Sequence, residues 1–352
     1  MNRYGLRVTY LVTRNPYFVK GINMREEILS LLTGKKTDKV PVFSGLIHIT
    51  SEGLESEGLV FHEVHHDAGK MARAAASAFK LTGMPSATLP LDLCVPAEAL
   101  GATLNFYESG EHRFPQPAKV LFASTKYLNT AYFQNADFIN KGRIQTICEA
   151  IKILKDGVGE DVVISGMIPG PYTLLLYLIE AGGLFAEMKR EPNAVLDALF
   201  HLSSFLSQIG NAYKNAGADF ITIHDMGGSA GFIGPAKYEQ FVFPSEKHLI
   251  EQLPKPCVLS VCGKMDKSIH LLGQTGADAI SLDQLTDLAA ARLALKAVML
   301  FGNIDPVVTL YRGDEAQVHE AVSRAKEAGV DAVWPGCDLV PSTPIQNIKP
   351  LM

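Results

Sequence analysis

The sequence predicts an α/β protein, a (β/α)8 barrel built as a single domain with an insertion after the second strand. A glycine-containing pattern recurs three times, apolar runs of strand length recur along the chain, and helical stretches separate these runs. Eight such runs over about 300 residues are typical of this barrel. The next choice, a doubly wound sheet, is disfavoured because no G-x-G-x-x-G follows the first run.

The recurring pattern joins the end of a helix to a strand. Ala216–His224 is similar to Thr275–Asp283, and both are similar to Ala328–Cys337. The glycine in each copy suits a helix C-terminus, where positive φ is required. The apolar run after it suits a buried parallel strand. Repetition of helix, glycine and strand predicts successive βα units.

The strands follow from the apolar runs, and helices are expected between them. The eight predicted strands are Val40–Leu46, Ala87–Asp92, Val162–Ile168, Phe220–Asp225, Cys257–Gly263, Ala279–Gln284, Val298–Ile304 and Ala332–Cys337. The clearest predicted helices are Asp67–Leu81, Ile139–Lys155, Asn193–Lys214 and Tyr238–Gln252. Residues 95–135 read as an irregular or β-rich insertion.

The ends of the chain and its longest apolar stretch define the domain. Residues 1–23 carry positive charges but no apolar core of a signal peptide, so we expect an N-terminal extension before a single domain at 24–352. The longest apolar stretch, 162–185, is interrupted by Pro169, Pro171 and Glu180, so no membrane span is expected.

Charge and cysteine usage narrow the class of protein. Lys and Arg number 32 against 37 Asp and Glu, a net charge of -5, whereas nucleic-acid binders usually carry a basic excess. The five cysteines are an odd number in a large chain, which favours free or metal-bound thiols in a reducing, cytoplasmic location. Cys94, Cys148 and Cys257 are expected to be core or helix-face residues.

Polar side chains cluster at the predicted strand ends, where barrel enzymes place their catalytic groups. Cys262 and Cys337 end the fifth and eighth strands, and two thiolates with nitrogen or oxygen ligands form a set typical of zinc. The structural alternative is that both are buried as small apolar residues. The other groups at strand ends are Asp92, His224, Asp225, Ser260, Asp283, Asn303, Asp305 and Asp338.

Six stretches carry a resemblance to a known family. They are PLDLCVPAEALGA (90–102), SGMIPGPYTLL (165–175), ADFITIHDMGGSAGFIGPAKYEQFVFP (218–244), VLSVCGK (258–264), LFGNIDP (300–306) and PGCDLVPSTPIQNIKPLM (335–352). They resemble the uroporphyrinogen decarboxylase superfamily, and most closely its corrinoid-dependent branch, the methylcobalamin:coenzyme M methyltransferases. The resemblance runs from about Met24 to the C-terminus. It implies a (β/α)8 barrel whose zinc activates a thiol that accepts a methyl group.

Carried onto this sequence, the resemblance implies a set of site residues. Cys262 and Cys337 match the zinc cysteines, and Asp283 falls where the branch can supply an acidic ligand. Ser260 stands where the family has its histidine ligand, and serine is a poor zinc ligand, so His224 on the neighbouring strand is a candidate replacement. The candidate catalytic residues are Asp92, His224 and Asp283; the candidate substrate-binding residues are Glu98, Asp225, Asn303 and Asp305.

The resemblance also implies partners. The chain lacks the D-x-H-x-x-G pattern of base-off corrinoid domains, so methylcobalamin, as substrate, is expected on a separate corrinoid protein. The small-molecule methyl acceptor stays open between coenzyme M, tetrahydrofolate and another thiol. The oligomeric state stays open too.

Three other interpretations remain. Uroporphyrinogen decarboxylation would use Asp92, but no arginine occurs between Arg25 and Arg73 to bind a substrate with eight carboxylates. A metal-free binding protein on the same barrel would explain Ser260. The segment 62–66, HEVHH, matches the zincin motif, yet we interpret it as a solvated histidine cluster away from the catalytic rim.

Overall fold

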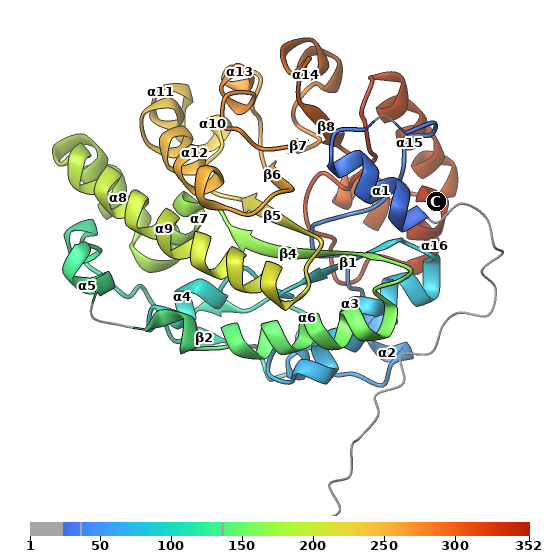
Figure 1. Cartoon of the computed structure of the whole chain (residues 1–352), viewed down its shortest axis with the longest axis horizontal. Coiled ribbons are helices and arrows are strands. Elements are labelled where there is room, and N and C mark those ends of the chain that lie inside the picture. The colour runs from blue at the N-terminus through green and yellow to red at the C-terminus, as the bar shows by residue number, and fades with distance from the viewer. Residues whose placement is uncertain (1–23, 36, 135–136) are drawn as a thin grey trace, which may run out of the picture.

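The computed structural model describes residues 24–35, 37–134 and 137–352, so the predicted extension at 1–23 lies outside the described residues. Its centre is a sheet of six parallel strands (Figure 1). In order across the sheet they are β1 (Ser86–Leu89), β4 (Val163–Pro169), β5 (Phe220–Asp225), β6 (Cys257–Val261), β7 (Ala279–Leu282) and β8 (Met299–Gly302). They correspond to the second to seventh predicted strands.

The first and eighth predicted strands do not form regular strands. Val40–Leu46 and Ala332–Cys337 are reduced to isolated parallel bridges, which pair Val42 with Val333 and Phe301 with Ala332. Proline and glycine interrupt both segments, and proline cannot donate to a ladder. The bridges nevertheless place the last segment between β8 and the first segment. The first segment reaches β1 through Ser44, whose N–H donates to Ser86 Oγ at 2.9 Å.

Helices cover the outside of the sheet, and the four clearest predictions are confirmed. Figure 1 shows α6 and α9 running alongside β4. The predicted helices appear as α3 (Ala68–Thr82), α6 (Ile144–Val158), α9 (Pro192–Ala216) and α12 (Phe243–Gln252), the last preceded by a π-helical turn at Tyr238–Val242. The other α-helices are α1 (Met24–Leu32), α2 (Ser51–Ser56), α4 (Val95–Ala99), α5 (Thr130–Gln134), α7 (Pro171–Leu178), α8 (Ala181–Arg190), α10 (Ala230–Ile233), α11 (Pro235–Lys237), α13 (Ile269–Leu272), α14 (Leu288–Ala294), α15 (Glu315–Glu327) and α16 (Ile345–Ile348).

Gly217 and Gly329 follow the ends of α9 and α15, as their pattern predicts, whereas Gly276 lies in the turn beyond α13, which ends at Leu272. Gly217, Gly276 and Gly329 have φ of 117°, 86° and 86°, a region that side chains other than glycine rarely adopt. Of the two alternatives predicted for the insertion at 95–135, irregular or β-rich, the described residues fit the irregular one better. The insertion holds one antiparallel pair, β2 (Leu104–Asn105) with β3 (Gln116–Pro117), between short helices, because its many turn residues leave little room for ladders.

An aromatic layer fills the end of the barrel where the strands begin. The rings of Phe43 and Phe301 each lie 5.1 Å from the Trp334 ring, centre to centre, and Phe220 belongs to the same buried cluster. Helix α1 packs against this layer through Ile28, Leu31 and Leu32. The start of the barrel is therefore closed by apolar side chains, and the polar groups gather at the strands' carboxyl ends.

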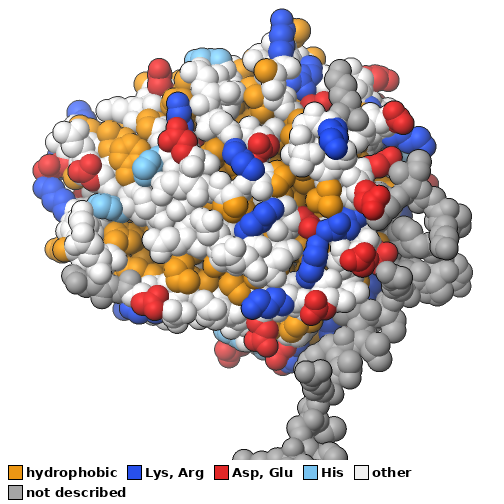
Figure 2. Space-filling view, in the orientation of Figure 1, with side chains coloured by type: hydrophobic (Ala, Val, Ile, Leu, Met, Phe, Trp, Pro, Cys, Tyr) orange, Lys and Arg blue, Asp and Glu red, His pale blue; other side chains and the backbone are white. Residues whose placement is uncertain are grey.

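The surface carries charges of both signs. On the face shown in Figure 2, Lys and Arg side chains are interspersed with Asp and Glu. That face therefore offers no basic stretch of the kind that binds nucleic acid. Within the described ranges, every helix is too short or too polar to span a bilayer.

Candidate active site

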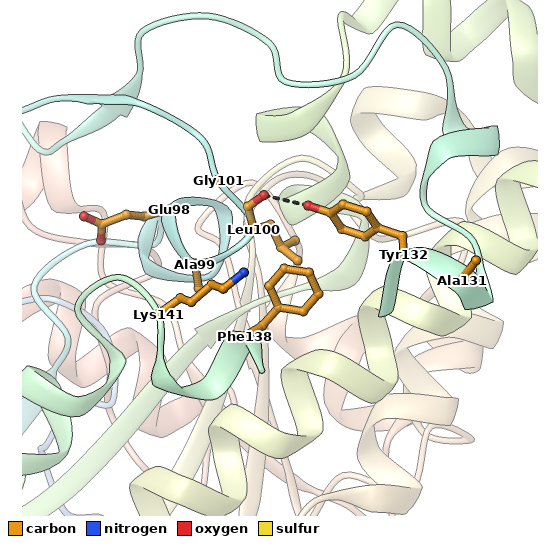
Figure 3. Close-up of a pocket in the computed structure, with 8 residues that line it drawn as sticks. All are labelled: Glu98, Ala99, Leu100, Gly101, Ala131, Tyr132, Phe138 and Lys141. Atoms are coloured by element: carbon orange, nitrogen blue, oxygen red, sulfur yellow. Dashed lines mark hydrogen bonds between the residues drawn. The ribbon is translucent and has the colours of Figure 1, made fainter. Parts of the chain in front are cut away.

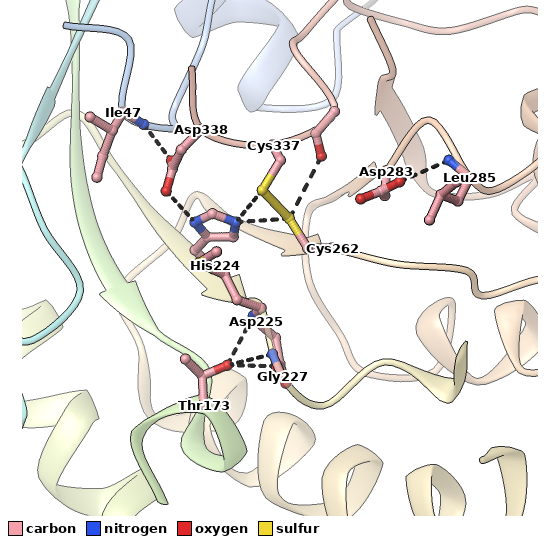
Figure 4. The surroundings of a disulfide bond; sticks show 12 residues. Ile47, Thr173, His224, Asp225, Gly227, Cys262, Asp283, Leu285, Cys337 and Asp338 are labelled. Atoms are coloured by element: carbon pink, nitrogen blue, oxygen red, sulfur yellow. Dashed lines mark hydrogen bonds and ion pairs between the residues drawn. A yellow bond between two sulfur atoms is a disulfide. The ribbon is translucent and has the colours of Figure 1, made fainter. Parts of the chain in front are cut away.

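Two cysteines and one histidine meet at the carboxyl ends of three parallel segments (Figure 4). His224 comes from the end of β5, Cys262 directly follows β6, and Cys337 follows the last bridged segment. His224 Nε2 lies 3.3 Å from Cys262 Sγ and 3.7 Å from Cys337 Sγ. The three donor atoms all lie within 4.8 Å of one another, and among the described residues they form the group that fits a metal ion.

The two sulfur atoms are joined as a disulfide in this structure, with their Cα atoms 6.1 Å apart. Cys262 and Cys337 therefore lie at the same end of the barrel, although 75 residues separate them in sequence. Cys262 is buried and Cys337 is half-buried. Of the described cysteines, the remaining three, Cys94, Cys148 and Cys257, are free and buried.

Asp338 sits behind the imidazole of His224. Its Oδ2 lies 3.5 Å from His224 Nδ1, and its Oδ1 accepts the N–H of Ile47 at 2.8 Å. Burial raises the pKa of Asp338, and the neighbouring histidine opposes that rise. A carboxylate at Nδ1 directs Nε2 toward the sulfurs, as second-sphere carboxylates do for metal-bound histidines. Asp338 is one of the polar groups predicted at the strand ends, and its place directly after Cys337 was the signal for a role beside the cysteines.

Ser260 and Asp283 occupy the positions that the resemblance marks as further ligands. Ser260 pairs in register with His224, and its buried hydroxyl has no hydrogen-bond partner among the described residues. Asp283 follows β7, accepts the N–H of Leu285 at 2.8 Å, and is outside the three-donor group. Burial raises the pKa of the Asp283 carboxyl. The structure thus brings His224 next to both sulfurs.

Asp225 fixes the loop after β5 from inside. Its Oδ1 accepts the hydroxyl of Thr173 at 2.7 Å and the N–H groups of Gly227 and Gly228 at 3.1 and 2.7 Å. Its carboxyl also faces Glu246 of α12, which is fully buried. Burial, with the charge of Asp225, raises the pKa of Glu246 well above its ordinary value. Asp225 therefore anchors the segment that carries His224.

Replacing Glu246 with glutamine should make the free energy of unfolding depend less on pH between pH 5 and 8. A raised folded-state pKa means that the folded protein holds a proton that the unfolded chain releases above pH 4.5, so stability falls as pH rises from there. Glu246→Gln removes this fall, up to about 1.4 kcal/mol per pH unit. Urea unfolding between pH 5 and 8 measures it, with the exposed Glu239→Gln as control. Parallel curves for wild type and Glu246→Gln would contradict the assignment.

A buried charge network surrounds Asp92. Arg143 Nη1 and Nη2 donate to the two Asp92 oxygens at 2.7 and 3.2 Å, and His65 Nδ1 lies 3.0 Å from Oδ2. Arg143 Nε also donates to Glu98 at 2.7 Å. Burial opposes ionisation, yet Arg143 and His65 hold the pKa of Asp92 well below its usual range. Asp92 and Glu98 are thus engaged by the protein itself.

The solvated-histidine interpretation of 62–66 is wrong for His65. Its side chain is buried and contacts Asp92, because the segment forms a short 3-10 turn at Glu63–His65 that packs inward before α3. The zincin motif is not realised either, since His62 and His66 do not lie on a regular helix.

The remaining predicted binding residues, Asn303 and Asp305, hold the loops after β7 and β8. Asn303 Nδ2 donates to the carbonyls of Asp283 and Thr286 at 3.1 and 3.0 Å. Asp305 Oδ1 accepts the N–H groups of Val307 and Val308, each at 2.8 Å. Both residues shape the rim through backbone contacts.

One cavity, with a volume of about 290 Å³, opens beside the group formed by His224, Cys262 and Cys337. It is lined by Ile47, Asp92, Leu93, Phe114, Pro115, Gln116, Tyr177, Met226, Cys337, Asp338, Leu339, Val340 and Pro341. A second hollow lies beside α4 and α5 (Figure 3). There the Tyr132 hydroxyl donates to the Leu100 carbonyl and Glu98 turns away from the rings. The first cavity reaches Cys337, and the second reaches no thiol or imidazole.

Comparison with known proteins agrees with this geometry. The family profile described as uroporphyrinogen decarboxylase (URO-D) matches residues 23–352. A methylcobamide:CoM methyltransferase MtaA of Methanosarcina barkeri is 30% identical over 331 residues, covering 94% of this chain and 96% of the relative. The methylcobamide:CoM methyltransferase MtbA of Methanosarcina acetivorans is 28% identical and covers 93% and 96%. A uroporphyrinogen decarboxylase of Thermodesulfovibrio yellowstonii is 30% identical over 67% of this chain and 68% of its own.

A solved structure extends the comparison to the fold. A methyltransferase from Methanosarcina mazei superposes with a TM-score of 0.87 at 26% identity, covering 94% of this chain and 97% of its own. The predicted fold class and the predicted resemblance to the methyltransferase branch are confirmed. With a profile match over nearly its whole length, the chain belongs to the uroporphyrinogen decarboxylase (URO-D) family.

Proposed function

We propose that this protein transfers a methyl group from a methylated corrinoid, carried by a partner protein, to a small thiol. The observation that supports it best is the meeting of His224 Nε2 with the sulfurs of Cys262 and Cys337. The relatives named as methylcobamide:CoM methyltransferases, which match over more than nine-tenths of the chain, support the same reaction class.

The cysteine pair works in its reduced form. In a cytoplasmic location the two thiols stay reduced, and with the imidazole they supply the one nitrogen and two sulfurs that zinc favours. Three protein ligands leave a fourth position for the acceptor. Zinc bound there would remove the proton from a coordinated thiol, whose pKa is otherwise near 8.5.

The protein's own groups then position the reactants. Asp338 orients the His224 ring, and Asp225 holds the strand end that carries it. The cavity beside Cys337 would receive the acceptor thiolate at the carboxyl ends of the strands. The thiolate sulfur forms a bond to the methyl carbon while the cobalt–carbon bond breaks, and that electron pair stays on cobalt.

Decarboxylation of uroporphyrinogen fits this site less well. Asp92, the residue that it would use, has both oxygens engaged by Arg143 and His65. The described lining of the cavity contains no Arg or Lys for the substrate's carboxylates. Guanidinium groups are the usual partners of carboxylates in such sites.

The decisive experiment follows methylcobalamin by its visible spectrum. Reduced protein with zinc is expected to demethylate methylcobalamin when a thiol is added, and oxidised or chelated protein is expected to lose at least 90% of that rate. Equal rates in the oxidised protein, or decarboxylation of uroporphyrinogen in place of methyl transfer, would overturn the proposal. Failure of the reduced protein to retain zinc would favour a metal-free binding protein.

A further inference from the structure

The position of the cavity fixes where a methyl acceptor must sit. Its volume of about 290 Å³ is lined by Cys337 and Asp338, whereas Cys262 and His224 are not among its lining residues. The volume is at the lower edge of the ~300–1,000 Å³ that small-molecule sites span. A molecule of a few heavy atoms fits this space better than the joined rings and tail of a folate.

The described lining of the cavity contains two carboxylates, Asp92 and Asp338, and no Lys or Arg. The charge of Asp92 is already paired with Arg143, which lies outside the lining. Arg143 lies close to Asp92, but its three nitrogen groups are occupied by Asp92 and Glu98, and its side chain is buried. An anionic group in the cavity would therefore lose its hydration without gaining a cation.

Neutral polar groups and apolar side chains make up the rest of the lining. The Tyr177 hydroxyl makes no hydrogen bond to a described residue, and burial raises the pKa of this phenol, so it stays a donor. Gln116 of β3 lies at the exposed edge. Phe114 and Leu339 supply apolar surface. Such a lining suits a short alkyl chain with an uncharged or positively charged end.

We infer that the methyl acceptor is a small thiol without an anionic group, in contrast to the sulfonate-bearing coenzyme M of the relatives. The inference rests on the proposed function and names the acceptor class of the same site. It follows from the absence of a Lys or Arg in the described lining of the cavity next to Cys337. A sulfonate two carbons from the thiol would lose its hydration there beside the Asp338 carboxyl and would gain no counter-ion.

Three thiols that share the HS–CH2–CH2– skeleton test this directly. They are 2-mercaptoethanol, cysteamine and 2-mercaptoethanesulfonate, which carry a neutral, a cationic and an anionic end. With zinc-loaded, reduced protein and methylcobalamin, kcat/KM for each of the first two is expected to exceed that for the sulfonate at least tenfold. Calorimetric titration of the same thiols, without methylcobalamin, should give the same order of Kd.

A variant with an added cation sharpens the test. Gln116→Arg should raise the ratio of sulfonate to 2-mercaptoethanol turnover at least fivefold, and Gln134→Arg on α5, outside the cavity, should leave it unchanged. Equal or better turnover and binding of the sulfonate by the wild type would overturn the inference and leave the proposed function intact. If no thiol is methylated, the proposed methyl transfer is overturned instead. The order of the three Kd values from calorimetry would then still test the inference about the acceptor.

Discussion

Cys262→Ala is expected to abolish methyl transfer while leaving the protein folded. Losing one thiolate leaves His224 and Cys337, too few ligands for the proposed zinc, so the acceptor thiol stays protonated at neutral pH. The residue lies at a strand end, where barrel residues serve the site more than the core. The change in stability should stay within the common range of about 0.5–3 kcal/mol.

Cys257→Ala provides the matched control. Cys257 begins the same strand, is also buried, and is free. Under reducing conditions its variant should retain activity and zinc, whereas Cys262→Ala should lose both, by methylcobalamin assay and metal analysis. Full activity of Cys262→Ala would show that the nucleophile is activated elsewhere.

Arg143→Met is expected to cause a large loss of stability. Arg143 is 5% exposed and forms ion pairs with Asp92 and Glu98, so its removal leaves the buried Asp92 carboxylate and the half-buried Glu98 without this cation. Breaking such a pair from one side costs about 3–5 kcal/mol. Urea unfolding measures the loss, and Arg324→Met, which removes an exposed ion pair, should change stability little.

The pH dependence of this stability loss, and its response to a second substitution, test whether the unpaired Asp92 carboxylate causes it. The lowered pKa of Asp92 stabilises the folded protein above the ordinary value of 3.8, and this contribution fades as pH falls below it. The difference between wild type and Arg143→Met should therefore shrink in acid. Adding Asp92→Asn to Arg143→Met should recover part of the loss at neutral pH, and strict additivity would rule out a coupled pair.

The sequence predicted the strands that stand between long helices, because apolar runs and helix-ending glycines are local signals. It therefore placed Cys262 and Asp283 at the correct ends of β6 and β7. It overestimated the first and last strands, where proline and glycine within apolar runs limit pairing to single bridges. The roles of these residues in catalysis stay predictions.

Contacts between segments that are distant in sequence could not be predicted from local patterns. His65, Asp92 and Arg143 come from three elements, and no periodicity in any one of them indicates that they share charge. The position of His224 was easier to predict. Because β5 pairs in parallel with β6, His224 lies in register with Ser260, so the neighbouring strand supplies an imidazole where this strand has serine.

In the described part of the chain, the aromatic layer of Phe43, Phe301 and Trp334, with α1 packed against it, closes the end of the barrel where the strands begin. Under the proposed function, acceptor and methyl donor would both approach from the opposite end, where the cavity of about 290 Å³ lies. With the donor carried by a corrinoid protein, we expect the acceptor to bind first and its methylated form to leave last, an order that product-inhibition patterns would reveal. A partner docked over the carboxyl ends of the strands would cover this cavity, so we expect its arrival and departure to set the rate of turnover.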